Sequence, residues 1–124
     1  MANEISVNLN VRVVNGNMTE TIQPGQIQID QAAVGRAGHA QSIGFAAPEV
    51  VDLGDISTNG VMYLRNLDET NYVTYGPQSD AATIEVMGKL KPGEVALFRL
   101  APTIVLWAQA DTADCLLDIK LFED

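Results

Sequence analysis

The chain has 124 residues, of which 47% are hydrophobic and 19% are charged, a length typical of one compact domain. Seven Lys and Arg against sixteen Asp and Glu give a formal net charge of −9. This balance argues against nucleic acid or an anionic membrane surface as the main partner, because both attract basic patches. The single cysteine, Cys115, and the single histidine, His39, exclude an intramolecular disulfide and a closed zinc site made of Cys and His.

Membrane insertion and export are not expected either. Residues 1–4 lack the charged and apolar segments of a signal peptide. The longest uncharged apolar stretch, residues 100–110, is far shorter than the roughly twenty residues of a membrane-spanning helix.

The first thirty residues predict strands, forming the start of the sheet or an arm. Apolar residues from Ile5 to Val13 alternate with polar ones, a period of two that places the apolar side chains on one face of a strand. Asn15-Gly16 suits a type I′ turn, so residues 17–22 are expected to return as the partner strand. Pro24-Gly25 predicts another turn, followed by a third short strand over residues 27–29.

Residues 31–44 predict an extended loop rich in Gly and Ala. Their side chains supply little apolar volume, and glycines are too frequent for a stable helix. A long stretch without regular structure in a compact domain is often functional. Since this one contains Arg36 and His39, we treat it as a candidate contact region.

The remainder, residues 45–124, predicts the main sandwich. Lys91-Pro92-Gly93-Glu94 has proline and glycine in the positions that a type II turn requires, and Asp80 to Met87 is open to one helical turn in place of a strand. The other segments predict strands over residues 49–53, 61–66, 71–75, 83–87, 95–100, 104–110 and 115–122. We therefore expect a single all-β domain over residues 1–124, an antiparallel β-sandwich or jelly roll of about ten short strands with one extended loop.

The sequence offers no set of residues for catalysis. No Gly-x-Ser-x-Gly motif occurs, His39 has no partners at metal-ligand spacing, and Cys115 precedes Leu116 and Leu117 as a small buried residue would. The close carboxylate pairs fall at predicted turns, where Asp bonds the nearby backbone, and no calcium-loop pattern is present; these pairs are Asp52/Asp55, Asp68/Glu69 and Asp111/Asp114. We expect a non-enzymatic protein without a metal or a cofactor.

A binding module for carbohydrate or a host surface remains an alternative. Its platform would consist of exposed aromatic side chains, for which Tyr63, Tyr72, Tyr75 and Trp107 are the candidates. Trp107 lies in the apolar run of residues 104–108, so core packing is the simpler explanation for it.

Several segments from Ala40 onward resemble small virion structural proteins of tailed bacteriophages and prophages. They include Tyr63-Leu64-Arg65-Asn66-Leu67-Asp68-Glu69, Leu90-Lys91-Pro92-Gly93-Glu94-Val95 and the ending Leu121-Phe122-Glu123-Asp124, together with residues 40–44 and 51–55. The resemblance spans about two-thirds of the chain, is weakest over residues 31–39, and implies a β-sandwich with a virion role and no active site.

The preferred role implied by this resemblance is a capsid decoration, or cement, protein. Such a subunit is made in the host cytoplasm, sits on the capsid surface and stabilises the shell by binding the major capsid protein. A tail or fibre component is the alternative within the same class.

Decoration subunits commonly form trimers, in which an N-terminal strand adds to the sheet edge of a neighbour. We also note Arg65 and Arg99, each of which interrupts an apolar strand and either contacts a partner or faces solvent beside a carboxylate. The candidate partner contacts are Val7, Leu9, Val11, Arg36, His39, Arg65, Asn66 and Asp68.

Overall fold

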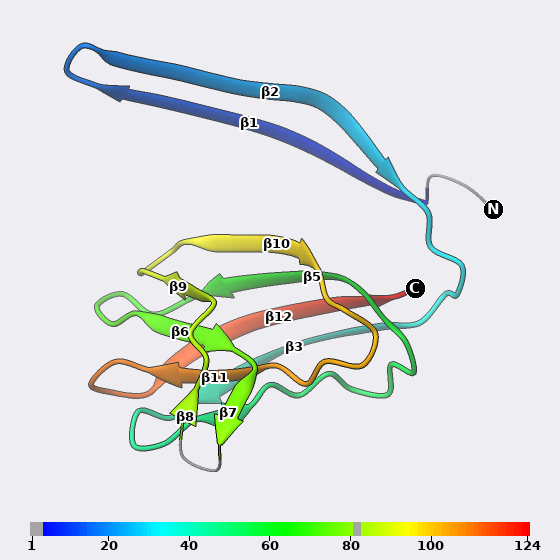
Figure 1. Cartoon of the computed structure of the whole chain (residues 1–124), viewed down its shortest axis with the longest axis vertical. Coiled ribbons are helices and arrows are strands. Elements are labelled where there is room, and N and C mark those ends of the chain that lie inside the picture. Colours follow the sequence, from blue (N-terminus) through cyan, green and yellow to red (C-terminus); the bar gives the residue numbers. More distant parts are fainter. Residues whose placement is uncertain (1–3, 81–82) are drawn as a thin grey trace. The chain divides into compact units, whose positions relative to one another are not determined.

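The computed structural model describes residues 4–80 and 83–124, and all of its regular structure is β (Figure 1). The chain forms two compact units, residues 1–32 and residues 33–124, which we call the hairpin unit and the sandwich unit. The predicted all-β class is confirmed, with twelve strands within the described residues.

The hairpin unit consists of β1 (Ile5–Asn15) and β2 (Met18–Ile29), paired antiparallel along their whole lengths. The expected hairpin is present, with Gly16 at a φ of 58° in the tight turn between Asn15 and Met18, a left-handed conformation that glycine adopts at no steric cost. Residues 16–17 close this turn, one position later in the chain than the predicted pair Asn15-Gly16.

The turn predicted at Pro24-Gly25 is wrong, because β2 runs straight through it. The register shifts between Leu9 and Val11, so that Gln23 and Pro24 together face Asn10. Such a β-bulge accommodates a proline that has no N–H to donate, and Gly25 accepts its φ of 83°. The two strands that we predicted over residues 17–29 are therefore one.

The sandwich unit contains two four-stranded antiparallel sheets. Sheet I has the order β10 (Val95–Arg99), β5 (Asn59–Asn66), β12 (Cys115–Glu123) and β3 (Arg36–Ile43). Sheet II has the order β4 (Glu49–Val50), β11 (Trp107–Ala110), β6 (Val73–Gly76) and β9 (Gly88–Leu90). A short pair, β7 (Gln78–Asp80) with β8 (Thr83–Ile84), follows β6.

The core lies between the two sheets and draws alternate residues from both. Sheet I supplies Met62, Leu64, Leu117, Ile119 and Leu121, and sheet II supplies Val73, Tyr75, Leu90, Ala108 and Ala110. The rings of Tyr75 in β6 and Phe98 in β10 stack with their centroids 5.9 Å apart, which joins the sheets directly. This arrangement is a β-sandwich.

The loop expected over residues 31–44 is largely a strand, and this corrects the prediction. Strand β3 pairs with β12 from Arg36, opposite Phe122, to Ile43, opposite Cys115. Pairing with the long β12 outweighs the weak strand propensity of the Gly and Ala residues in β3.

Two further differences concern residues 76–94. A helical turn at Asp80 to Met87 is wrong, since β8 occupies Thr83–Ile84, although residues 81–82 lie outside the described residues. The turn at residues 91–94 is confirmed: Gly93 has a φ of 80°, and the N–H of Glu94 donates to the carbonyl of Lys91 at 3.0 Å.

Candidate functional site

The hairpin unit has one apolar face. Because directly opposite residues of antiparallel strands point to the same side, the pairs Ile5/Ile29, Val7/Ile27 and Val11/Ile22 stack along it. Leu9 and Val13 continue the row on β1, while the other face carries Ser, Asn, Gln, Thr and Arg12, with Val14 near its tip. The expected contacts Val7, Leu9 and Val11 thus share a face, which we call the hairpin face.

The hairpin face is exposed in a single copy of the chain. Leu9, Ile22 and Ile27 have exposed fractions of 44%, 47% and 39%. A two-stranded hairpin is at best marginally stable in water when nothing covers it. The residues that alternate so regularly in the sequence therefore form an apolar surface that one copy of the chain leaves uncovered.

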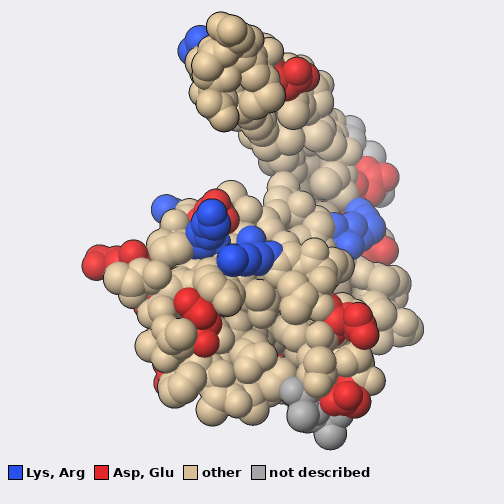
Figure 2. All heavy atoms as spheres, turned by 60° about the vertical axis from the view of Figure 1, so that its left-hand side comes forward, with Lys and Arg blue, Asp and Glu red and all other residues tan. Residues whose placement is uncertain are grey.

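The outer face of sheet I is the second unusual surface, and it gathers positive charge. Each of its four strands contributes one outward cation: Arg99 from β10, Arg65 from β5, Lys120 from β12 and Arg36 from β3. These are four of the seven Lys and Arg in the chain, whereas Asp118 is the one of sixteen Asp and Glu that lies within the same face among the described strands. Figure 2 shows Lys and Arg side chains clustering on the surface while Asp and Glu are scattered.

Two of these cations are already paired and two are not. Arg99 lies 3.4 Å from Asp124, and Lys120 lies 3.1 Å from Asp118 with its ammonium 5.5 Å from the ring centre of Tyr63. Within residues 4–80 and 83–124, Arg36 and Arg65 have no carboxylate at ion-pair distance. Arg65 faces outward from β5, as both of our interpretations of it require, but it has no carboxylate partner among those residues, and its role as a partner contact stays a prediction.

The same face is also apolar and hollow. Val95, Leu97 and Leu116 point outward with exposed fractions of 56%, 48% and 46%. Toward the other edge of the same sheet a hollow of about 490 Å³ lies over β3 and β12, bordered by Arg36, Asp118, Lys120 and Phe122. It exists because Gly38 and Ala40, the outward residues of β3 between the larger side chains, fill almost no space. We call this surface, with its cations, the sheet I outer face.

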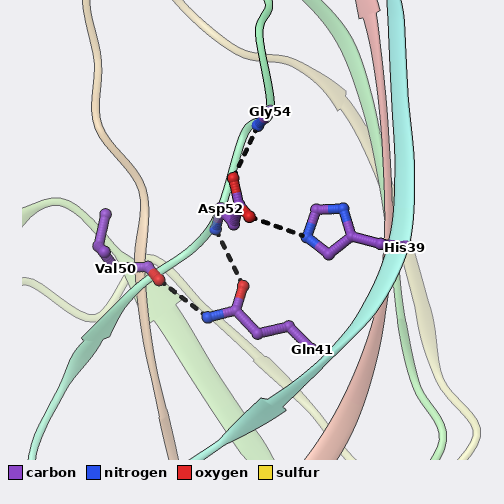
Figure 3. A network of polar contacts seen from close by, with 5 residues as sticks. All are labelled: His39, Gln41, Val50, Asp52 and Gly54. Carbon is purple, nitrogen blue, oxygen red and sulfur yellow. Dashed lines mark hydrogen bonds and ion pairs between the residues drawn. The ribbon is translucent and has the colours of Figure 1, made fainter.

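His39 lies on the opposite side of β3 from Arg36 and has a structural environment (Figure 3). Its Nε2 atom is 4.0 Å from Oδ2 of Asp52 and is buried without a hydrogen bond. Next to it, Gln41 donates from Nε2 to the carbonyl of Val50 at 3.0 Å and accepts the N–H of Asp52 at 2.9 Å. The inner side of β3 thereby contacts residues 50–54 through Gln41. His39 lies on this inner side next to Asp52 and does not point outward to a partner.

Asn66 is wrongly predicted as a direct contact, because its side chain is 0% exposed. Its Nδ2 donates to the carbonyls of Asn71 at 2.8 Å and Leu90 at 3.0 Å, and its Oδ1 accepts the N–H of Asp68 at 3.0 Å. In the segment Arg65-Asn66-Leu67-Asp68, which is part of the resemblance to virion proteins, Asn66 is the residue that holds the turn after β5 to the sandwich.

Asp68 closes the same turn. Its Oδ2 accepts the N–H of Thr70 at 3.0 Å and the N–H of Asn71 at 2.6 Å. These bonds to the ionised form lower the pKa of the Asp68 carboxyl. Asp52 likewise accepts the N–H of Gly54 at 2.9 Å, so for these two carboxylates the predicted turn role is confirmed.

The remaining chemical candidates occupy interior or partly covered positions. Cys115 is 1% exposed, as expected for a small buried residue, and burial raises the pKa of its thiol. Tyr75 is buried, and Tyr63, Tyr72 and Trp107 are half-buried, which weighs against a broad aromatic platform for sugars.

No group of three or more His, Cys, Asp and Glu side chains in the described part of the chain could hold a metal ion. The described residues also contain no helix with the length and hydropathy to cross a membrane.

Comparison with known proteins gives little further guidance. No family model matches the chain, and no curated protein matches it. A solved chain from Bacillus endospore appendages, which form a family of disulfide-linked pili, aligns over 79% of this chain and 100% of its own length, with a TM-score of 0.39 and 13% sequence identity. A similarity of this degree supports no conclusion about function.

Sequence reasoning missed the sheet I outer face. Its cations are far apart in the sequence, from Arg36 to Lys120, and only the strand order brings them together. The one available signal was a single cation at an outward position in each strand, and it required the loop at residues 31–44 to be recognised as β3.

Proposed function

We propose that this protein is a non-enzymatic structural subunit of a bacteriophage virion, a decoration protein that binds the assembled capsid shell and stabilises it. The observation that carries the proposal is the hairpin unit, whose apolar face is exposed in one copy of the chain. Such a unit gains its stability from a neighbouring surface. A protein that completes itself by binding neighbours is suited to assembly.

The chemistry of the sandwich unit supports the same proposal. The segments that resemble virion proteins supply turns and core: Asn66 and Asp68 hold one turn, and Gly93 forms the next. Four of the seven Lys and Arg lie on one sheet face, which suits an extended protein contact in a chain of net charge −9. Binding only to the assembled shell would stabilise that shell by mass action.

The trimer is part of this proposal, with one change to its expected contact. Strand β1 is already paired with β2 along one edge, so it would reach a neighbour's sheet only as part of the hairpin. The hairpin instead offers its apolar face.

The experiment is a reconstitution. Shells of the major capsid protein that lack this chain are incubated with the purified protein, sedimented, and assayed for bound protein and for thermal disruption. We expect saturable binding and a higher disruption temperature. If the protein stays in the supernatant, and the disruption temperature is unchanged, the decoration role is wrong.

A further inference from the structure

We propose that the hairpin face of one copy packs on the sheet I outer face of a second copy, so that the chain assembles head to tail. The proposal deepens the proposed function by naming the partner of the hairpin, and it rests on that function only in treating the chain as an assembly subunit. The contact would join the two exposed surfaces described above, which complement each other in apolar area, charge and shape.

The first argument is apolar area. An apolar sheet face requires another layer to cover it, and in the structure of one copy Leu9, Ile22 and Ile27 remain exposed. The outer face of a sandwich sheet is ordinarily polar along its exposed positions. Here Val95, Leu97 and Leu116 interrupt that pattern.

The second argument is charge. Between residues 4 and 30 the hairpin unit has the carboxylates Glu4, Glu20 and Asp30 against Arg12. Glu20 lies on the apolar side itself, directly opposite Val13. On the sheet I outer face Arg99 is paired with Asp124 and Lys120 with Asp118, so Arg36 and Arg65 leave this face net positive among the described residues. Opposite signs therefore meet in head-to-tail packing, whereas two hairpin faces packed on each other would bring like charges together.

The third argument is shape and reach. Gly38 and Ala40 leave the hollow over β3 and β12, which gives an approaching layer room for its side chains. The six residues 30–35 that connect β2 to β3 span up to about 20 Å when extended, which gives the hairpin a tether of that length.

The size of the contact predicts how strong it is. A hairpin of this length is about 36 Å long and about 10 Å wide, so it covers roughly 360 Å² on each partner. One such contact is smaller than a standard stable interface of about 1,200–2,000 Å² in total. Since a head-to-tail contact repeats, closure into a ring gives each chain two contacts, and assembly should depend on concentration.

The test uses the purified full-length chain and measures its mass by light scattering across a concentration series. The wild type should form a closed oligomer that dissociates on dilution to the single-chain mass of 13.3 kDa. Val13→Lys places a cation on the hairpin face and should leave only single chains. Val14→Lys is the matched control, since Val14 is the neighbouring residue on the opposite face of β1, and it should assemble like the wild type.

On the receiving surface, Arg65→Glu should also give single chains, and Lys89→Glu in sheet II, which makes the same change of charge, should not. The melting transition of each variant shows that it is folded. Mixing Val13→Lys with Arg65→Glu then decides the geometry, because the first keeps an intact sheet I outer face and the second keeps an intact hairpin face. The mixture should form a one-to-one heterodimer, and this should need a higher protein concentration than wild-type assembly, because the pair makes one contact and cannot close into a ring.

Three results would overturn the proposal. The first is a wild type that remains a single chain at every concentration. The second is an equal loss of assembly in Val13→Lys and Val14→Lys. The third is a mixture that yields no heterodimer at the highest concentration of the series, and an Arg65→Glu variant that still assembles by itself would then indicate hairpins packed on each other. None of these results depends on capsid shells, so the reconstitution described above tests the decoration role separately.

Discussion

Replacing Asn66 with Ala is the sharpest test of how the sandwich unit holds the loops at one end of β5. The side chain is fully buried and makes three hydrogen bonds with backbone groups of Asp68, Asn71 and Leu90. The variant leaves the carbonyl of Leu90 without its buried donor. It also removes the hydrogen bonds to the carbonyl of Asn71 and from the N–H of Asp68. An unsatisfied buried polar group costs about 1–3 kcal/mol, and the two partly buried groups, which water can reach, cost less.

We therefore expect Asn66→Ala to lower the free energy of unfolding by about 3 kcal/mol, a large share of the 5–15 kcal/mol typical of a small domain. Urea denaturation followed by circular dichroism measures it. Arg65→Ala is the control, because Arg65 is the preceding residue on the exposed side of β5, and its effect should stay within about 0.5 kcal/mol. If Asn66→Ala changes the free energy of unfolding by less than about 1 kcal/mol, the hydrogen-bond argument is refuted.

Three further predictions concern charge, pH and thiol chemistry. Arg65→Ala should weaken binding to shells while leaving the melting temperature of the free chain nearly unchanged; a lower melting temperature would make Arg65 a structural residue. Glu123 accepts hydrogen bonds from the hydroxyl and the N–H of Ser57 at 2.6 and 2.8 Å, and these bonds lower the pKa of its carboxyl. The contribution of Glu123 to stability is therefore present above the ordinary carboxyl pKa near 4.5 and is lost as the pH falls through the lowered value. Glu123→Gln should flatten the dependence of the melting temperature on pH in that range. Cys115 should resist a maleimide in the native protein and react after denaturation, and rapid labelling of the native protein would contradict its burial.

The sequence predicts the fold class and much of the strand pattern, for reasons that the structure makes clear. The alternation from Ile5 to Val13 identifies β1, and Pro92-Gly93 identifies a turn, because in both cases the signal is local. Strand β3 has no such signal: its residues are small, and it becomes a strand through pairing with β12, more than seventy positions away in the chain.

The candidate site divides in the same way. Val7, Leu9 and Val11 could be predicted to share a face because one strand positions them. The sheet I outer face could not be predicted from the sequence, because its four cations come from strands whose order is set by the whole fold. Asn66 was misassigned because a polar residue in a turn-like motif is usually exposed, and its burial follows from contacts with residues 71 and 90.

The copy number of this chain in purified virus particles tests the central claim most directly. Quantitative mass spectrometry compares it with the copy number of the major shell protein in the same particles. A decoration subunit predicts a ratio that approaches one or equals a fixed large fraction of it. A handful of copies for each particle would indicate a tail or fibre component, and absence of the chain from the particles would contradict a virion role.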